Sequence, residues 1–553
     1  MILKKILNSI NKIINIERLN FITFLFLSII ITFLELFNIY VISSFINFII
    51  VEENNNNKTW IFEYLNIENF QTAALFTICT IIIRCVGSYM IKSYEFFYVY
   101  RVLAKVTNNY FRNILNLDYK KILEFKFSRL TNTMMHEIVN FVLCIFQPSI
   151  IILLEVLISL TLIIYTFIFI DFLFIFLACI FAILYFVFFL ITNPINTSLG
   201  KRRLLFEQRR FNLINDNIRG IRHLKFSNSN YLVDLLSDTL FNYGDITAKK
   251  KILVISSKYL LELIAYIALI SLLIISYNMS INFLTDVITL VAISFRLVPS
   301  FNRIISEAFV IKFNLPVLEK AIDLNYIKKQ NTNKIIIGNL KNNFTDQIRL
   351  SNITFKYNLS KKHIFKNYSL KISKNKITGI TGKSGVGKTT LVNIISGLLR
   401  IDYGKFFIDN VEINDKKKLF SWSKNVSLFS QDSFIFNGSI KENILFGEAL
   451  DLKRLNKICN ELNIFEFINK KNLSRFIDPY KNNLSSGQIQ RILLARALYK
   501  KSMIYIFDEP TTNLDKKNKD KFMNYLKNYK NTYLIVTHDK ELLKNVDRLV
   551  KIK

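Results

Sequence analysis

The sequence predicts a multi-domain chain in which an all-α membrane domain of six helices precedes an α/β domain. The 553 residues are 51% hydrophobic with only 14 glycines, which is too apolar for an ordinary soluble enzyme. The apolar residues gather in six long stretches of the first half. In the second half, strand-like runs alternate with helical patterns, which is typical of a mostly parallel sheet. The five predicted strand runs are IRLSNITFKY, KITGI, NVSLFS, MIYIFD and TYLIVTH. We therefore expect a transmembrane domain at 1–320, a polar linker at 321–346 and a second domain at 347–553.

The six apolar stretches are each long enough to cross a bilayer, which takes roughly 20 largely apolar residues. The connections at 93–140 and 193–252 are rich in Lys and Arg, which places them in the cytoplasm by the positive-inside rule. They look helical, so we expect them to extend spans two to five, with turns near 118–128 and 220–228. The connection at 51–71 holds four glutamates against a single lysine and is expected outside. The expected spans are 19–49, 72–92, 141–167, 170–192, 253–277 and 281–312.

The formal charge of +32 is compatible with a nucleic-acid partner or with anionic lipid. Lys, Asn and Ile are abundant throughout, so compositional bias explains much of the charge equally well. A soluble ATPase acting on nucleic acid would not carry six apolar spans, and we expect no nucleic-acid partner. The cysteines form no CxxC pair, so no zinc site or disulfide framework is expected. Residues 1–20 place apolar residues at helical spacing among lysines, which favours an interfacial helix.

The first chemical motif is GKSGVGKT, which follows a predicted strand and matches G-x-x-x-x-G-K-[ST]. In such a loop, glycines let backbone N–H groups surround phosphates. Lys388 would meet the β and γ oxygens, and Thr389 would offer a hydroxyl to Mg²⁺. A lone match can be an incidental glycine-rich turn, but a strand before it and a helix after it argue against that. The expected phosphate-binding residues are Gly382, Lys383, Ser384, Gly385, Val386, Gly387, Lys388, Thr389 and Thr390.

Acidic residues follow a second apolar run, MIYIFDE. Asp508 is expected to bind Mg²⁺, and Glu509 sits where a base polarises the attacking water. Upstream, LSSGQ precedes a helix of strong helix formers, whose N-terminus offers free N–H groups to an anion. Its residues Leu484, Ser485, Ser486, Gly487 and Gln488 are expected to form a second phosphate site. Three further polar residues complete the series in order along the chain: Gln431, Asp515 and His538.

With this ordered set the chain resembles the ATP-binding cassette (ABC) family, and six spans before one cassette resemble an exporter half-transporter of type IV. The resemblance implies ATP and Mg²⁺ as cofactors, ATP hydrolysis coupled to transport, and coupling helices on the two cytoplasmic segments. It makes Tyr357 the aromatic residue that stacks on adenine and His538 a sensor of the γ-phosphate. Gln431 is implied both in catalysis and in magnesium binding. One cassette per chain implies a dimer, expected to be a homodimer in the cytoplasmic (inner) membrane.

Three departures from the family pattern limit the transfer of its properties. Ser486 replaces the usual glycine of LSGGQ and adds a hydroxymethyl group beside the phosphate. The stretch RFIDPYKNN replaces the glycine-rich approach common before the signature in exporters. TTNLD replaces the usual SALD, although Asp515 is retained. Together they leave open the hydrolysis rate and the communication with the coupling helices.

The stretch RLVPSFNRI lies near the end of the sixth apolar run. A charged side chain well inside a span usually faces a bundle interior or an aqueous cavity. Arg296 and Arg303 are two helical turns apart on one face, with Pro299 and Ser300. Guanidinium groups suit a pyrophosphate head group. The alternative is that the span ends near residue 298, which would leave Arg303 outside the hydrocarbon.

In this region the chain resembles bacterial lipid-linked oligosaccharide flippases of the PglK type. The resemblance includes EYLNI at 63–67 as a short outer helix and Glu35, Arg84 and Glu262 in the spans. Lys258 stands where another arginine is expected. The implied substrate residues are Arg84, Lys258, Arg296 and Arg303. We expect Glu35 or Glu262 to pair with the resting arginines. A lipid-linked oligosaccharide is therefore the leading substrate, and peptides or lipid and drug-like amphiphiles remain alternatives.

Overall fold

A computed structural model describes the chain from residue 10 to residue 552, with gaps. It divides into two units, which are treated separately below. The helical unit comprises Met1–Leu115 and Phe127–Gln330, and the cassette unit comprises Asn116–Lys126 and Asn331–Lys553. The cassette unit thus includes a short piece of the predicted transmembrane domain. The residues outside the description within that range are 12–13, 52–59, 66, 68, 126, 170–171, 227–230, 277–280, 321–343, 359–361, 431, 469–471 and 479–483.

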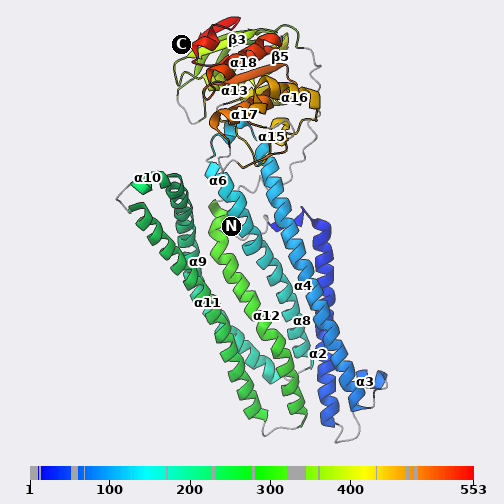
Figure 1. Cartoon of the computed structure of the whole chain (residues 1–553). Helices are drawn as coiled ribbons and strands as arrows, with labels where there is room; N and C mark the ends of the chain where they lie inside the picture. The colour runs from blue at the N-terminus through cyan, green and yellow to red at the C-terminus, as the bar shows by residue number, and fades with distance from the viewer. Residues whose placement is uncertain are drawn as a thin grey trace. The chain divides into compact units, whose positions relative to one another are not determined.

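Long helices make up the helical unit (Figure 1). α4 and α11 have 46 residues each. At 1.5 Å per residue each extends roughly 69 Å, more than twice the ~30 Å of a bilayer's hydrocarbon core. The chain's basic connections thus continue the helices, as predicted. The elements are α2 (Arg18–Val51), α3 (Trp60–Tyr64), α4 (Phe70–Leu115), α6 (Phe127–Asn132), α7 (Ile138–Phe141), α8 (Gln147–Phe169), α9 (Phe172–Arg219), α10 (Ile221–Phe226), α11 (Tyr231–Ser276) and α12 (Ile281–Lys320).

Three helices in the described part of the chain are long and apolar enough to cross a membrane. They are Arg18–Ile46, Phe70–Leu115 and Leu130–Ile168, and they contain most of the first three predicted spans. The remaining predicted spans fall in α9, α11 and α12, whose side chains are described only in part. Those three spans stay predictions. The predicted interfacial helix at 1–20 lies mostly outside the described residues.

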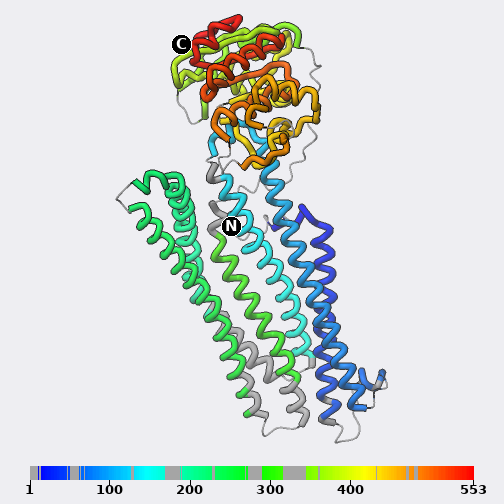
Figure 2. The backbone as a smooth tube through the Cα atoms, viewed as in Figure 1, coloured from blue at the N-terminus to red at the C-terminus, as the bar shows by residue number. Residues whose placement is uncertain are grey.

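Helix α9 runs beside α11 and α12 (Figures 1 and 2). A Cβ atom on Gly200 of α9 would lie 2.3 Å from the carbonyl oxygen of Phe313 on α12, so only glycine fits there. One turn earlier, the Asn196 side chain donates to the Phe309 carbonyl at 2.9 Å. Asn196 is completely buried. The two helices therefore meet backbone to backbone at this crossing.

The short helix α3 lies between α2 and α4 in the chain. Its residues Ile61 and Phe62 are buried in a cluster with Val41 and Ala73. The predicted outer helix at 63–67 overlaps α3 only at its start, because the helix ends at Tyr64. The apolar residues before Glu63 explain the shift, since they fix this turn to the helices.

Two π-helical turns interrupt the helix that continues into α8. They are η1 (Thr133–Glu137) and η2 (Val142–Phe146), on either side of α7. The Thr133 hydroxyl bonds to the Glu137 carboxylate at 2.6 Å across η1. Single π turns of this kind widen a helix locally by one residue.

The cassette unit contains a five-stranded parallel sheet, ordered β11-β3-β10-β9-β6. β9 and β10 are buried at every residue, as expected of central parallel strands. The predicted mostly parallel sheet is confirmed for four of the five strand runs. The strands are β3 (Ile377–Gly382), β6 (Val426–Phe429), β9 (Ile504–Asp508), β10 (Thr532–Val536) and β11 (Arg548–Ile552).

The fifth predicted run, IRLSNITFKY, does not join that sheet. It forms β1 (Gln347–Phe355) of an antiparallel sheet ordered β2-β1-β4-β5. The other strands are β2 (Phe365–Ser373), β4 (Tyr403–Ile408) and β5 (Val411–Glu412). A second small pair, β7 (Gly438–Ser439) and β8 (Phe476–Ile477), is also antiparallel. The helices are α5 (Tyr119–Ile122), α13 (Lys388–Ile395), α14 (Lys416–Lys424), α15 (Ile440–Leu445), α16 (Leu452–Glu461), α17 (Ser486–Tyr499), α18 (Lys516–Asn528) and α19 (Lys540–Leu543).

Candidate functional site

The glycine-rich loop joins β3 to α13, in the strand–loop–helix setting that its sequence predicted. Gly387 caps α13 with φ at 102°, a conformation that favours glycine. A Cβ atom there would lie 2.4 Å from the Ile364 side chain, so the lack of space, as well as the backbone conformation, favours glycine. Gly385 also has a positive φ, at 79°. The loop thus turns the first backbone N–H groups of α13 toward its own concave side, where an anion is stabilised by the helix dipole.

Lys388 lies across the mouth of this loop. Its ammonium group donates to the carbonyls of Gly382 at 2.8 Å and Lys383 at 3.1 Å. It also lies 2.9 Å from Nε2 of His538. The parallel order β3-β10-β9 brings the ends of these strands to one edge of the sheet, so residues 150 positions apart meet there.

Thr389 and Asp508 form the candidate magnesium site. The Thr389 hydroxyl donates to Asp508 Oδ2 at 3.1 Å, which puts two hard oxygen ligands side by side. That donor set fits Mg²⁺, which prefers carboxylate, hydroxyl and phosphate oxygens. Burial raises the pKa of Asp508, and the Thr389 hydrogen bond lowers it in part. Gln431, the third predicted magnesium and catalytic residue, lies outside the described residues.

Glu509 follows β9 with φ at 52°, a left-handed conformation that a glutamate rarely adopts. Its N–H donates to the Val536 carbonyl at 2.8 Å, and the Thr537 hydroxyl donates to Glu509 Oε2 at 3.2 Å. Nε2 of His538 lies 3.9 Å from the other carboxylate oxygen. The left-handed backbone and these neighbours direct the carboxylate toward His538, which itself lies beside Lys388. Thr537 gives no signal in the sequence beyond its place before the histidine.

The signature LSSGQ starts α17. Ser485 is the N-cap and forms a capping box with Gln488, in which each side chain accepts from the other residue's N–H. Among the described residues, these hydrogen bonds stay within their own turn, and none joins the signature to loop 382–390 of the same chain. Ser486 is exposed, and Leu484 is buried. A Cβ atom on Gly487 would lie 2.8 Å from the Asn513 carbonyl.

Gln490 is a site residue that the sequence did not single out. It is 4% exposed. Its side chain donates to the Pro510 carbonyl and accepts from the Asn513 N–H at 2.9 Å. It thus ties the signature helix to the segment immediately after Glu509. The available signal was its place two residues after the signature, which the motif alone does not interpret.

Asp515 was predicted to bind the cofactor, but its hydrogen bonds lie elsewhere. It is the N-cap of α18 and accepts from the Asn518 N–H at 3.0 Å. The Asn518 backbone and side chain hold its pKa below the usual range. Tyr357 lies beside the glycine-rich loop: its hydroxyl is 3.2 Å from the Thr390 hydroxyl, and its ring stands edge-on to Phe355.

The four predicted substrate residues behave differently from one another. Arg296 bonds through Nε to Glu35 at 2.5 Å and lies 3.5 Å from Glu155. Arg303 bonds to the other Glu155 oxygen at 2.7 Å, and the Ser300 hydroxyl donates to Glu155 at 2.6 Å. The two arginines are thus members of a neutral cluster joining α2, α8 and α12, with Glu35 as one predicted partner. Glu155, which the sequence reasoning missed, is the other.

Arg84 and Lys258 lie outside this cluster as far as the described contacts go. Arg84 contacts Cys85, its neighbour in the chain. Lys258 pairs with Glu262 at 3.6 Å, and both side chains are exposed. Glu262, the second glutamate expected to pair with the arginines, therefore pairs with Lys258. The difference arises because Lys258 and Glu262 are one turn apart on α11.

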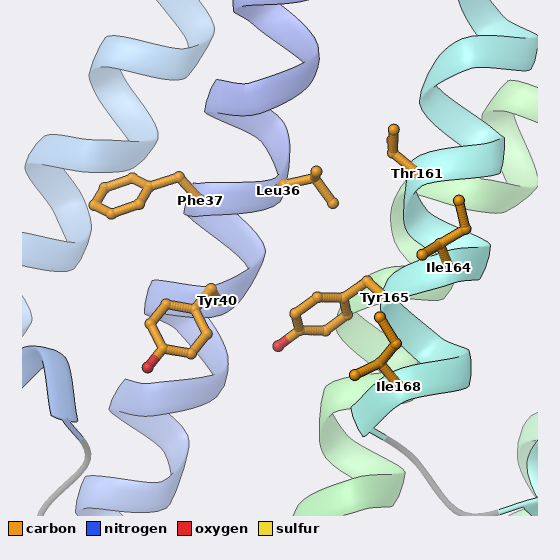
Figure 3. Close-up of a pocket in the computed structure, with 7 residues that line it drawn as sticks. All are labelled: Leu36, Phe37, Tyr40, Thr161, Ile164, Tyr165 and Ile168. Atoms are coloured by element: carbon orange, nitrogen blue, oxygen red, sulfur yellow. The ribbon is translucent and has the colours of Figure 1, made fainter.

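An apolar groove of about 350 Å³ lies between α2 and α8 (Figure 3). Its α2 side follows directly after Glu35, so the groove begins beside the charged cluster. Figure 3 shows the rings of Tyr40 and Tyr165 on opposite sides of it. The lining residues are Leu36, Phe37, Tyr40, Thr161, Ile164, Tyr165 and Ile168.

The chain is similar to known proteins in the sequence of its second half and in its fold. Residues 365–512 match the family model of ABC transporters. The chain is 31% identical to a probable microcin-H47 secretion/processing ATP-binding protein of Escherichia coli, over 37% of this chain and 30% of that protein. It is 29% identical to the ATP-dependent lipid A-core flippase of Pasteurella multocida, over 38% of this chain and 37% of that protein. The chain thus spans about a third of the length of these curated relatives.

Among solved structures, a bacterial Atm1-family ABC exporter with ATP bound superposes with a TM-score of 0.76. The match covers 97% of this chain and 93% of that one, at 15% sequence identity. At that identity the likeness concerns the fold, and it spans the helical unit as well as the cassette. Residues 365–512 thus match the ABC transporter family model, and the chain as a whole shares the fold of that exporter structure.

Proposed function

We propose that the protein is an ATP-driven exporter or flippase that works as a homodimer in the cytoplasmic membrane, with its cassette in the cytoplasm. The glycine-rich loop would hold the triphosphate, with Lys388 at its β and γ oxygens. Thr389 and Asp508 would hold Mg²⁺, which neutralises charge on the phosphates. Glu509 would orient the attacking water, and His538 would contact the γ-phosphate. The observation that carries this assignment is the meeting of Lys388, Thr389, Asp508 and Glu509 at one sheet edge.

The single cassette favours a dimer. Ser485 and Gln488 bond within their own turn, and Ser486 is exposed, so the signature of one chain is available to the loop of a second. Two copies would then enclose two nucleotides. The same reasoning makes Ser486 a direct neighbour of the phosphate that the partner's loop holds.

We predict that Ser486→Gly raises ATPase activity, because it removes a hydroxymethyl group from the phosphate side of α17. The check is the steady-state ATPase rate of the purified protein at saturating ATP. Ser485→Ala is the contrasting change, since it removes the side-chain cap of α17 and should lower the rate. An unchanged or lower rate in Ser486→Gly would mean that serine is accommodated at the site.

For the substrate we propose an amphiphile with an anionic head group, led by a lipid-linked oligosaccharide. A charged cluster next to an apolar groove suits a molecule with both a head group and a hydrocarbon chain. Arg303 is 55% exposed, whereas Arg296 is 16% exposed and has two carboxylates near it. Arg303 is therefore the better placed of the two to meet a head group. Peptides and lipid or drug-like amphiphiles are the alternative substrates, and one relative is named for microcin-H47 secretion or processing.

We predict that Arg303→Ala impairs flipping of a lipid-linked oligosaccharide in proteoliposomes by roughly tenfold to a hundredfold, since one charge-assisted contact contributes about 1.5–3 kcal/mol. Basal ATPase activity should stay close to the wild type, because the nucleotide residues lie in the cassette. Arg303→Lys should retain part of the activity, since lysine lacks the planar fork. Arg209→Ala, which removes an exposed arginine of the helical unit, is the matched control. Normal flipping in Arg303→Ala would refute the proposed substrate. Transport of a peptide but not of the lipid by the wild-type protein would also refute it.

A further inference from the structure

The segment 116–126, which includes α5, belongs to the cassette unit and touches the loop around Tyr357. The Asn358 side chain donates to the Glu124 carboxylate. The ammonium group of Lys120 lies 5.0 Å from the centre of the Phe355 ring. The residues that flank the candidate adenine-stacking tyrosine are therefore in contact with a segment more than 200 positions earlier in the chain.

The carboxylate of Asp402 contacts both the segment 116–126 and the loop around Tyr357. One of its oxygens pairs with Lys120 at 2.9 Å, and the other accepts from the Lys356 N–H at 2.8 Å. Lys120 and Asp402 are 19% and 25% exposed, so the pair is largely shielded from water. Lys356 and Asn358, the two neighbours of Tyr357, are thus both held by contacts that lead to the segment.

The side chain of Tyr119 adds an apolar contact at the same place. Tyr119 and Tyr357 both pack against the core that lies beneath the antiparallel sheet. Burial raises the pKa of Tyr119, and the nearby Asp432 carboxylate raises it further. Asp432 directly follows Gln431. Tyr119 therefore lies near both the loop of Tyr357 and the segment after β6.

At the other end of the segment, Lys416 pairs with Asp118 at 2.8 Å and donates to the Asn116 carbonyl at 3.3 Å. This pair is 62% and 54% exposed and involves none of the residues around Tyr357. It anchors the segment on the cassette without touching the tyrosine loop. Lys416 and Asp118 therefore attach the segment to the cassette, whereas Lys120 and Glu124 contact the loop around Tyr357.

We infer that Lys120 and Glu124 are positioning residues for Tyr357 and set the affinity of the cassette for the adenine base. The inference rests on the proposed ATP-binding function. Stacking of a ring on a base depends on the position and tilt of the ring, which here follow from the backbone of residues 356–358. Neither residue has to touch the nucleotide. Ligands without a base should be indifferent to both side chains.

The experiment compares two ligands on the full-length protein in detergent, Mg²⁺–ATP and Mg²⁺–tripolyphosphate, by calorimetric titration. In the double variant Lys120→Ala with Glu124→Ala, the Kd for ATP should rise about fivefold to tenfold. The Kd for tripolyphosphate, which occupies the phosphate loop alone, should stay within about twofold of the wild type. Glu124→Gln keeps an oxygen acceptor for Asn358 and should retain the ATP affinity. Lys121→Ala, an exposed neighbour, is the matched control.

Two results would overturn the inference. An unchanged Kd for ATP in the double variant would show that Tyr357 keeps its position without these contacts. Equal losses for both ligands would show that the segment stabilises the whole cassette and does not act on the base. If the double variant does not fold, the single variants give the same comparison. Failure of the wild-type protein to bind ATP at all would refute the proposed function instead.

Discussion

Replacing Glu509 with glutamine should lower ATP turnover by at least about a hundredfold, the usual contribution of a general base, and leave ATP binding intact. The amide keeps the size of the side chain and its hydrogen bond from Thr537, but it can no longer accept a proton. Because φ at residue 509 is 52°, the backbone directs the side chain in either form. The bound nucleotide should therefore persist and hold two cassettes together.

The measurement is steady-state ATPase activity beside retention of radiolabelled ATP on the purified protein. Lys388→Ala gives the contrasting result, since it removes the ammonium group from the phosphate loop and should weaken binding itself. Glu448→Gln, an exposed acid of the same unit, controls for the loss of a charge. Wild-type turnover in Glu509→Gln would remove Glu509 from the catalytic role.

Glu155→Ala should destabilise the helical unit by about 3–5 kcal/mol, the usual cost of removing one partner from a buried ion pair. Glu155 is 5% exposed. One of its oxygens pairs with Arg303, and the other accepts from the Ser300 hydroxyl and lies 3.5 Å from Arg296. Without it, Arg296 keeps the carboxylate of Glu35, whereas Arg303 loses the carboxylate with which it pairs. Glu155→Gln keeps acceptor and shape but not charge, and it should fall between alanine and the wild type.

The thermal midpoint of the detergent-solubilised protein, followed by size-exclusion chromatography after heating, measures this loss. Glu262→Ala is the matched control, because it also removes a glutamate paired to a cation within the helical unit. That pair is exposed and long, at 3.6 Å, so the change should cost at most about 1 kcal/mol. Equal midpoints for the two variants would mean that the buried cluster adds no stability.

The cassette was largely predictable because its chemistry is written in short local motifs. The loop at 382–389, the acidic pair at 508–509 and the strands around them each follow from a few consecutive residues. The antiparallel sheet was not predictable in the same way, since β1 pairs with strands that follow it at different distances along the chain. Alternation alone does not reveal which partner a strand takes.

In the helical unit, the helices were predictable from the sequence, but the partners of the charged side chains were not. Its helices follow from runs of apolar residues, but the partners of its charges are 148 and 261 residues away in the chain. Arg296 and Arg303 both lie near Glu155, a partner that the sequence reasoning did not name. An acid in the middle of an apolar run was the available signal, because such an acid needs a partner. Asp515 also caps a helix, a local role that its place in the motif did not reveal.

The two π turns before α8 determine the angular phase of that helix. An α-helix turns by about 100° per residue, so each extra residue accommodated in a π turn rotates everything beyond it by that amount. With η1 and η2 in series, residues on α6 and α8 that an unbroken helix would place on one face are turned well apart. Deleting one residue from η2 would rotate Glu155 away from Ser300 and Arg303 without changing a single side chain of the cluster. The number of residues in η2 thus determines the direction in which Glu155 points, although Glu155 lies further along the chain in α8.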